Sequence, residues 1–427
     1  MMNDISPSLR GEAEAIQQTA VQAETPLDCF ASARNDGGGK RHGEARSHPV
    51  LPEGWELTRI GNEIELAYGK GLPSHVRIEG NYPVFGSNGC VGKHTEYFIE
   101  APGIIVGRKG SVGEVVYSAK NFWPIDTTYY VLNKKNHGWR FLFYLLQTLG
   151  LKKLNTHSAV PGLNREDAYK IEVFFPPQEV QEKISFTLDL ITEAIRIECE
   201  CIANAQDLKR AAMREVFTRG LRGEAQKQTE IGLVPESWTL QKVVKTVRPF
   251  KFERGKQLPT TAYQDTGKYP IIDQGQSDVA GYTDNDDCVI KPNIPLVIFG
   301  DHTRSLKYVD FPFALGADGT KPLVALDGLN PKFLFYAFAN LDIPSRGYNR
   351  HYKILAEKII AFPVLQEEQT QIVTLLSAID DKITLHKRKK AALEALFTSL
   401  LHQLMTGKIR VGDLDLSALN TPQTEEA

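Results

Sequence analysis

The chain carries the same series of sequence landmarks twice, and this repeat limits the folds open to it. The second copy of each landmark follows the first by 183 to 192 positions, and their order is kept. The paired landmarks are Pro52-Glu53-Gly54-Trp55 with Pro235-Glu236-Ser237-Trp238, Tyr82-Pro83 with Tyr269-Pro270, Phe141-Leu142-Phe143-Tyr144 with Phe333-Leu334-Phe335-Tyr336, and Phe175-Pro176 with Phe362-Pro363. A solenoid repeat spans only about 20–50 residues. The pattern therefore predicts two copies of one domain-sized unit.

Each copy starts with short apolar runs that are broken by Gly, Pro and Asn. Residues 103–107, 127–132 and, in the second copy, 296–299 are such runs, and they predict strands joined by turns. Helices are predicted over residues 139–149 and 331–341. Each copy therefore contains a globular domain of mixed α and β structure.

Each copy ends in a long helix with an apolar seam. The seam residues recur in steps of four and three with gaps, as in a heptad repeat. They are Ile184, Leu188, Ile191, Ile195, Ile202, Ala205, Ala212 and Val216 in the first copy, and Ile372, Leu376, Ile379, Ile383, Leu393, Phe397, Leu400 and Leu404 in the second. Glu198 and His386, which occupy matching positions, interrupt the two seams. Each helix is expected to span about 35 residues, or about 50 Å.

Two seams of equal length in one chain favour mutual packing of the helices, although each could pack on its own domain or on another subunit. The predicted fold class is α+β: two pseudo-twofold-related mixed α/β domains separated by two long antiparallel coiled-coil helices. The predicted boundaries are an N-terminal extension, expected to be mostly disordered, at 1–48, the first domain at 49–177, the first helix at 178–223, the second domain at 224–365, the second helix at 366–412 and an acidic tail at 413–427.

Composition excludes several classes of protein. Lys and Arg number 50 and Asp and Glu 52, so the net charge of -2 excludes a binder that is basic along its whole length, but not one with local basic surfaces. The five cysteines form no CxxC motif, which argues against a disulfide framework or a zinc site. Without an apolar run of about 18 residues or a signal-like N-terminus, a soluble cytoplasmic protein is expected.

Known catalytic motifs are missing from the sequence. There is no Asn/Asp-Pro-Pro-Tyr/Phe tetrapeptide and no HExxH pair. The glycines of residues 107–113 have GxxGxxG spacing and predict a hairpin rather than a dinucleotide site. We therefore expect no catalytic residue, no metal site and no cofactor in this chain.

Side chains that can form hydrogen bonds to the edges of DNA bases gather in loops at matching places in the two copies. Arg and Lys suit guanine, and Asn and Gln suit adenine. The predicted DNA-binding residues of the first domain are Lys70, His75, Arg77, Asn88, Lys93, His94, Arg108, Lys109, Ser111, Asn155, His157, Asn164 and Arg165. Those of the second domain are Arg254, Lys256, Gln274, Gln276, His302, Arg304, Arg346, Tyr348, Asn349, Arg350 and His351.

The repeated order of landmarks, Gly-rich strand region and long helix resembles the specificity subunit of type I restriction-modification systems. The resemblance covers residues 49–412, including the ending Met405-Thr406-Gly407-Lys408. It implies two domains that each read half of a split double-stranded DNA target, and helices that set the spacer and dock two methyltransferase subunits. Restriction/translocase subunits would join that core. S-adenosylmethionine, ATP and magnesium would bind to the partner subunits, which would methylate adenine and cut DNA.

Two other functions stay open on the sequence alone. A coiled-coil scaffold whose globular domains bind proteins would show no salt-dependent DNA affinity, because it would make no phosphate contacts. An enzyme with an unrecognised active site would transfer methyl groups from S-adenosylmethionine by itself. The loops differ more between the copies than the helices and landmarks do, which predicts two half-sites of different sequence.

Overall fold

The computed structural model describes residues 52–154, 162–252, 256–316, 319–345, 347 and 349–414. These divide into two compact units. Unit 1 contains the residues up to 194 and those from 394 onward, and unit 2 contains residues 195–393. The predicted N-terminal extension and nearly all of the predicted acidic tail lie outside the described residues.

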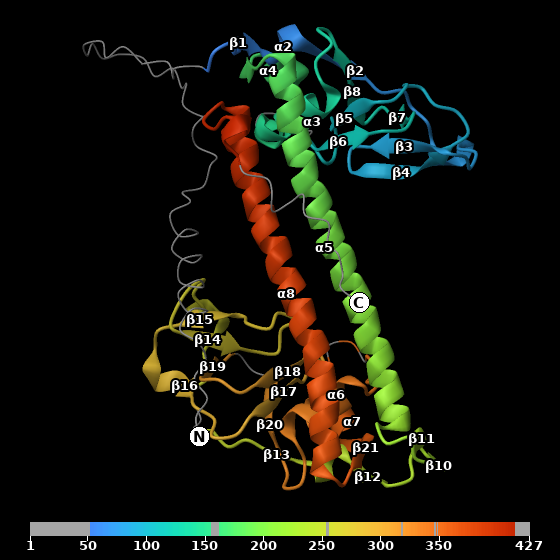
Figure 1. Ribbon diagram of the computed structural model, residues 1–427, viewed down its shortest axis with the longest axis vertical. Coiled ribbons are helices and arrows are strands. Elements are labelled where there is room, and N and C mark those ends of the chain that lie inside the picture. The colour runs from blue at the N-terminus through green and yellow to red at the C-terminus, as the bar shows by residue number, and fades with distance from the viewer. Residues whose placement is uncertain are drawn as a thin grey trace. The chain divides into compact units, whose positions relative to one another are not determined.

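The globular part of unit 1 contains two main sheets and a small strand pair (Figure 1). The larger sheet is antiparallel, in the order β2 (Ile64–Tyr68), β8 (Thr128–Asn133), β5 (Gly103–Gly107) and β6 (Val115–Ser118). The smaller has the order β4 (Gly89–His94), β3 (Tyr82–Gly86) and β7 (Trp123–Pro124), and β1 (Glu56–Arg59) pairs with β9 (Glu172–Phe175). The short helices are α2 (Ile60–Glu63), α3 (Trp139–Thr148) and α4 (Arg165–Tyr169).

The globular part of unit 2 repeats this plan. Its first sheet has the order β13 (Val247–Pro249), β20 (Thr320–Ala325), β17 (Leu296–Gly300) and β18 (Leu306–Val309). Its second sheet has the order β15 (Gly281–Thr283), β14 (Tyr269–Ile272), β19 (Phe313–Leu315) and β16 (Val289–Ile290). The pair β12 (Trp238–Lys242) and β21 (Ile359–Pro363) matches β1 and β9, and a hairpin of β10 (Gln226–Thr229) and β11 (Gly232–Pro235) precedes it. The helices are α6 (Pro331–Ala339) and α7 (Tyr352–Glu357).

The strand pairings confirm that the chain holds two copies of one mixed domain. β3 pairs with β7 in parallel, and its counterpart β14 pairs with β19 in parallel. The other sheet of each domain, which contains β5 in unit 1 and β17 in unit 2, is antiparallel. The predicted strands at 103–107 and 296–299 are β5 and β17, and the predicted helices at 139–149 and 331–341 are α3 and α6. The loop at residues 107–113 joins the antiparallel strands β5 and β6, as the hairpin prediction required.

Local sequence explains where α6 begins. The Asn330 side chain accepts hydrogen bonds from the backbone of Lys332 and Phe333, at 2.9 and 3.2 Å, and Pro331 occupies the first turn, where its missing N–H costs nothing. Phe333 and Tyr336 then point into the core and are fully buried. A cap at the start and an apolar face along one side are sufficient to fix this short helix against its sheet.

The two long helices are α5 (Gln178–Arg219), with 42 residues, and α8 (Gln366–Met405), with 40. Both are longer than the span of about 35 residues that the seams alone indicated, because each helix begins ahead of its first seam residue. The residues predicted to form the two seams are all buried or half-buried. The periodicity therefore identified the correct face of each helix.

Within unit 2, the contacts between α5 and α8 run in opposite directions along the two helices. His386 Nδ1 lies 2.6 Å from Glu198 Oε2, and Lys209 Nζ lies 2.6 Å from Asp380 Oδ1. The helices are therefore antiparallel there, as predicted. Both also pack on the second globular domain, since Phe217 of α5 and Ile372 of α8 belong to one core cluster with its side chains. α8 thus packs on its own domain, as the alternative prediction had it, in addition to packing on α5.

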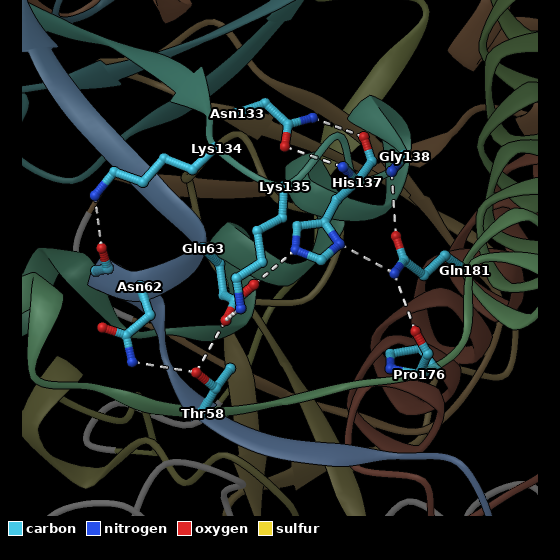
Figure 2. Close-up of polar contacts among 11 residues, drawn as sticks. Thr58, Asn62, Glu63, Asn133, Lys134, Lys135, His137, Gly138, Pro176 and Gln181 are labelled. Atoms are coloured by element: carbon cyan, nitrogen blue, oxygen red, sulfur yellow. Dashed lines mark hydrogen bonds and ion pairs between the residues drawn. The ribbon is translucent and has the colours of Figure 1, made fainter.

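A buried glutamine joins each long helix to the domain that precedes it. In unit 1, Gln181 Oε1 accepts a hydrogen bond from the backbone of Gly138, at 3.1 Å, and its Nε2 donates to Pro176 O, at 3.0 Å (Figure 2). In unit 2, the matching Gln369 accepts from the backbone of Asn330, at 2.7 Å, and donates to Pro363 O, at 2.9 Å. In each unit, one glutamine amide thus binds both the start of the domain's short helix and the end of the domain's last strand.

Unit 1 adds a charged network to this joint (Figure 2). Glu63, with 3% of its side chain exposed, lies 2.8 Å from His137 Nε2 and 2.9 Å from Lys135 Nζ. The amide nitrogen of Gln181 donates to His137 Nδ1, at 3.2 Å, so Nδ1 is the acceptor of the imidazole ring. The other ring nitrogen, His137 Nε2, then donates to the Glu63 carboxylate. Burial raises the pKa of Glu63, but hydrogen bonds from His137, Lys135 and Thr58 outweigh it and hold that pKa below its ordinary value.

Among the helices of the described residues, none combines the length and apolar character that a membrane crossing needs.

Candidate nucleic-acid interface

In each domain, polar loops that are far apart in sequence come together at matching strand ends. In unit 1 the backbone N–H of Leu163 donates to Arg108 O, at 2.9 Å, and Ser111 Oγ donates to Asn88 Oδ1, at 3.3 Å. The loops after β3, after β5 and before α4 therefore meet. Lys109, which is exposed, also bridges to Gly162 beside them.

Two predicted arginines of unit 1 lie against one tyrosine. The guanidinium carbons of Arg108 and Arg165 lie 5.2 and 5.1 Å from the centroid of the Tyr68 ring. Arg108 also donates to Asp126 O through Nε and Nη2, at 3.2 and 2.7 Å, which fixes its plane. Tyr68 is 53% exposed at the end of β2, so the group forms a cationic and aromatic surface open to a ligand.

A second tyrosine supports this group from inside. Tyr129 is buried, and its hydroxyl donates to Leu163 O, at 3.1 Å. Burial, followed by the neighbouring Tyr68 hydroxyl, raises the pKa of Tyr129 to about 12, against the opposing charges of Arg108 and Arg165. Tyr129 is therefore neutral at physiological pH and acts as a hydrogen-bond donor that ties the third loop to the sheet.

Several other predicted residues of unit 1 stay at the surface. Lys70 lies over the rings of Phe98 and Trp123, at 5.8 and 5.5 Å. Arg77 is used within the domain, because its guanidinium donates to Leu72 O and Val91 O. The remaining exposed candidates are His75, Asn88, Lys93 and Asn164.

One predicted residue of unit 1 lies in the interior. His94 is 7% exposed, its Nδ1 accepts the backbone N–H of Ile78, at 3.1 Å, and its ring lies edge-on to Trp123. A side chain used in this way cannot reach a base edge without opening the domain, so we remove His94 from the candidate surface.

The loops of unit 2 meet in the same way. Ser305 Oγ donates to Gln274 O, at 2.7 Å, and Thr303 Oγ1 donates to the same oxygen. Gln276 Nε2 donates to Thr303 O, at 3.3 Å, from an exposed position. The loop after β14 is therefore attached to the loop after β17, and each carries predicted residues.

Arg304 occupies an unusual backbone position in the second of these loops. Its φ is +62°, in the left-handed region that favours glycine, and its side chain is exposed. Nη1 donates to Ile343 O, at 2.8 Å, so the residue connects this loop to the one after α6. A non-glycine residue with this backbone strain at a loop tip is typical of a functional site.

The third loop of unit 2 is anchored by a residue that was predicted to bind DNA. His351 is fully buried, and both its backbone N–H and its Nδ1 lie near Asp301 O, at 2.7 and 3.0 Å. Asp301 Oδ1 accepts the backbone N–H of Tyr352, at 2.8 Å. We therefore reassign His351 from base contact to support of the loop, together with Asp301.

The other predicted residues of unit 2 divide between surface and undescribed positions. Asn349 and Arg350 are exposed, and His302 and Lys256 are half-buried. Five predicted residues of the chain lie outside the described residues: Asn155, His157, Arg254, Arg346 and Tyr348.

The matching loops share backbone contacts but carry different side chains. Arg108 follows β5 directly, and Asp301 follows the counterpart strand β17. In each case the carbonyl of this residue accepts a backbone N–H from the third loop, from Leu163 in unit 1 and from His351 in unit 2. A cation in one domain thus stands where an anion stands in the other, on the same framework.

The structure identifies two functional candidates that the sequence analysis missed, Tyr68 and Asp301. In the sequence Tyr68 ends an apolar run and resembles any strand tyrosine. Its role depends on Arg108 and Arg165, which reach it from two other segments. Within the described residues, no cluster of His, Cys, Asp and Glu could hold a metal ion.

Comparison with known families gives one match over most of the chain. Residues 52–205 and 245–395 match the family described as the type I restriction modification DNA specificity domain. The two matched segments fall on the two copies of the repeat.

The names of two relatives agree with this match, and one solved structure shares the fold. The type I restriction enzyme MjaVIII specificity subunit of Methanocaldococcus jannaschii is 25% identical over 413 residues, covering 86% of this chain and 95% of the relative. The putative MjaX specificity subunit of the same organism is 25% identical over 296 residues, covering 64% and 68%. The crystal structure of a type I restriction-modification S subunit from M. genitalium has the same fold, with a TM-score of 0.59 at 15% identity, covering 84% of this chain and 98% of that one.

Proposed function

Because the chain belongs to the type I restriction-modification DNA specificity family, its role is to provide DNA sequence specificity, and we propose that its two domains read two different halves of one split target. The observation that carries the proposal is the pair of matching loop clusters with unlike side chains. In unit 1 Arg108 reaches the surface beside Tyr68. Its counterpart in unit 2, Asp301, is buried, and the exposed side chains there are those of Gln276 and Arg304. Equivalent frameworks with different side chains suit an asymmetric, bipartite site.

The first half-site would be read by the surface around Arg108, Arg165 and Tyr68. Arginine can make two hydrogen bonds to guanine, and a ring that holds its guanidinium in one plane favours this geometry. The second half-site would be read from the loops that carry Gln276 and Arg304. Lysines such as Lys70 and Lys109 would contact phosphates and set the position on the duplex.

Catalysis in this system belongs to partner subunits, and this chain is the non-catalytic recognition subunit. Other restriction-modification subunits and DNA are therefore its partners. We expect S-adenosylmethionine, ATP and magnesium to bind to those subunits, where adenine methylation and DNA cleavage take place.

The outer face of the long helices supports docking of two methyltransferase subunits. Phe186, Ile197 and Leu208 of α5 follow one another at steps of eleven residues, which brings them to one face, and they are 58%, 42% and 57% exposed. Leu385 and Leu396 of α8 occupy the positions that match Ile197 and Leu208, and they are 51% and 40% exposed. Exposed apolar stripes of this kind mark protein interfaces, and a duplicated stripe suits two copies of one partner.

The helices would also set the spacer between the half-sites. α5 and α8 each run without a break for about 60 Å, at roughly 1.5 Å per residue. Deleting one heptad from either helix is expected to shorten the preferred spacer or to abolish binding. An unchanged spacer preference would contradict this role.

The two-domain proposal is tested by exchanging residues 234–365 for the corresponding domain of another family member. The methylation specificity of the assembled complex would be determined by sequencing modified DNA. One half-site should change and the other should stay. A change in both half-sites, or in neither, would refute the proposal.

A gel shift with the methyltransferase partner separates this function from that of a protein-binding scaffold. Specific DNA binding should weaken steeply with salt, because phosphate contacts release counterions. A scaffold would show no such binding.

A further inference from the structure

Two oppositely charged residues lie beneath the reading loops of unit 2. Lys307 belongs to β18 and Asp273 follows β14, and Lys307 Nζ lies 3.6 Å from Asp273 Oδ1. Their side chains are only 5% and 16% exposed. Among the residues that the structure describes, Nζ has no hydrogen-bond partner, so this ion pair is its main polar contact.

The folded domain keeps the Lys307 charge at a cost. Removing an ammonium group from water is unfavourable, and a single ion pair recovers only part of the loss. Burial accordingly lowers the pKa of Lys307, although Asp273 acts in the opposite direction. A buried lysine of this kind is therefore poorly explained by stability alone.

The first domain shows that the fold does not need the pair. Lys307 pairs with Ile298 across β17 and β18, and at the same place Val116 pairs with Ile105 across β5 and β6. The residue that matches Asp273 is Gly86, at the end of β3. The same sheets form in unit 1 without either charge.

The ion pair of Lys307 and Asp273 is connected to the loop of residues 273–277. Asp273 Oδ1 accepts the backbone N–H of Gly275, at 2.7 Å, and so shapes the turn into residues 273–277. This turn orients Gln274, whose carbonyl receives Ser305 Oγ at 2.7 Å, and Gln276, which reaches the neighbouring loop. Lys307 holds the carboxylate at the base of this arrangement.

We propose that Lys307 is a positioning residue for readout of the second half-site: through Asp273 it holds the loop of residues 273–277 in the geometry that meets the bases. It touches no base itself. The inference rests on the proposed function, because it assumes that this loop reads DNA.

The test uses the full chain, assembled with its methyltransferase subunits, and three variants: Lys307→Met, Asp273→Asn and the double variant. DNA libraries with one half-site randomised at a time measure discrimination at each half-site, and thermal unfolding measures stability. Lys307→Met should reduce discrimination at the second half-site by about 10-fold and leave the first unchanged. Each single variant should lower the unfolding midpoint, because it leaves one charge without its partner.

The double variant separates positioning from mere stability. With both charges removed, the unfolding midpoint should return to the wild-type value or exceed it. Discrimination at the second half-site should stay low, because the tether is gone. Recovery of discrimination together with stability would overturn the proposal, as would an equal loss at both half-sites.

A control variant tests the underlying assumption separately. Gln276→Ala removes an exposed loop side chain and leaves the ion pair intact. It should reduce discrimination at the second half-site. If Gln276→Ala and Lys307→Met both leave this half-site unchanged, the assignment of the loop to DNA readout fails, and with it the inference. If only Gln276→Ala has an effect, the inference alone fails.

Discussion

The guanidinium carbon of Arg108 lies 5.2 Å from the ring centroid of Tyr68, at the end of a strand where the ring is 53% exposed. Arg165 approaches the same ring from another segment, at 5.1 Å. Attraction between a cation and the face of a ring is worth about 0.5–2 kcal/mol. The tyrosine thus brings two like charges into one surface that neither arginine would form alone.

Removal of the ring should weaken DNA binding. Tyr68→Ala is expected to lower the affinity of the assembled complex for its target by about 10-fold, close to 1.4 kcal/mol, because both guanidiniums lose their orientation. Fluorescence anisotropy with labelled target DNA would measure the change. Tyr68→Phe keeps the ring and should bind almost as well as wild type. Equal effects of the two variants would show that the ring does not orient the arginines.

At position 304 the side chain can be removed without adding backbone strain, because glycine adopts a positive φ freely. Arg304→Gly suits the φ of +62°, whereas Arg304→Ala keeps the strain of a left-handed residue, about 1–2 kcal/mol. Both variants should lose discrimination at the second half-site, while Arg304→Gly should be the more stable of the two. Methylation of randomised targets and thermal unfolding would give the two readouts. Unchanged discrimination in Arg304→Gly would exclude Arg304 from readout.

The sequence predicted the parts of this structure that local patterns determine. Apolar runs bounded by turn residues identified β5 and β17, which are buried on both faces. Helical spacing identified α3, α6 and the seams of the long helices, because these depend on which face of a helix is apolar. The apolar seam alone indicated about 35 residues for each helix, fewer than the 42 and 40 observed, because each helix includes polar residues ahead of its first seam residue.

The composition of the site could be predicted only in part. In the sequence, His94 and His351 stand among polar residues like their exposed neighbours. The structure places His94 at the end of β4 and His351 before α7, and it shows that each side chain is used internally. Tyr68 could not be recognised in the sequence, because its role depends on Arg108 and Arg165, which are distant in sequence. Loop sequences contain the right residue types, but tertiary contacts decide which of them face outward.

Glu63 gives the stability of the first domain a defined pH dependence. Its folded-state pKa lies below the ordinary value of 4.5, so its contribution is fully present above that value and is lost as the pH falls through the folded-state pKa. Glu63→Gln should cost roughly 1.5–3 kcal/mol of unfolding free energy near pH 7, because Lys135 and His137 lose the charged acceptor of their hydrogen bonds.

The difference between Glu63→Gln and wild type should shrink below about pH 4.5, where the wild-type carboxyl becomes protonated. Denaturant unfolding at a series of pH values would measure it. Glu53→Gln, at an exposed carboxylate of the same domain, is the matched control and should have little effect at any pH. A Glu63→Gln deficit that stays constant down to pH 3 would contradict the role of the charge.

Two glycines close the long helices onto the starts of the two domains. Gly407, just after α8, has a φ of +67°, and a Cβ there would lie 2.9 Å from Cγ of Pro52. Gly220, just after α5, has a φ of +64°, and its Cβ would lie 2.9 Å from Oε1 of the buried Glu368 and 3.1 Å from Cγ of Pro235. Each helix end is thus packed on the Pro-Glu-x-Trp segment of one domain.

Alanine at these positions should destabilise the protein through both strain and overlap. Gly223 has the same φ of +64° but nothing within 4 Å of its Cβ position, so Gly223→Ala should show the cost of strain alone, about 1–2 kcal/mol. Gly407→Ala and Gly220→Ala should cost roughly 1–3 kcal/mol more, because the prolines cannot move freely away. Chemical unfolding would measure the three variants. If Gly407→Ala and Gly223→Ala were equally stable, the contact of Gly407 with Pro52 would not hold the helix end in place.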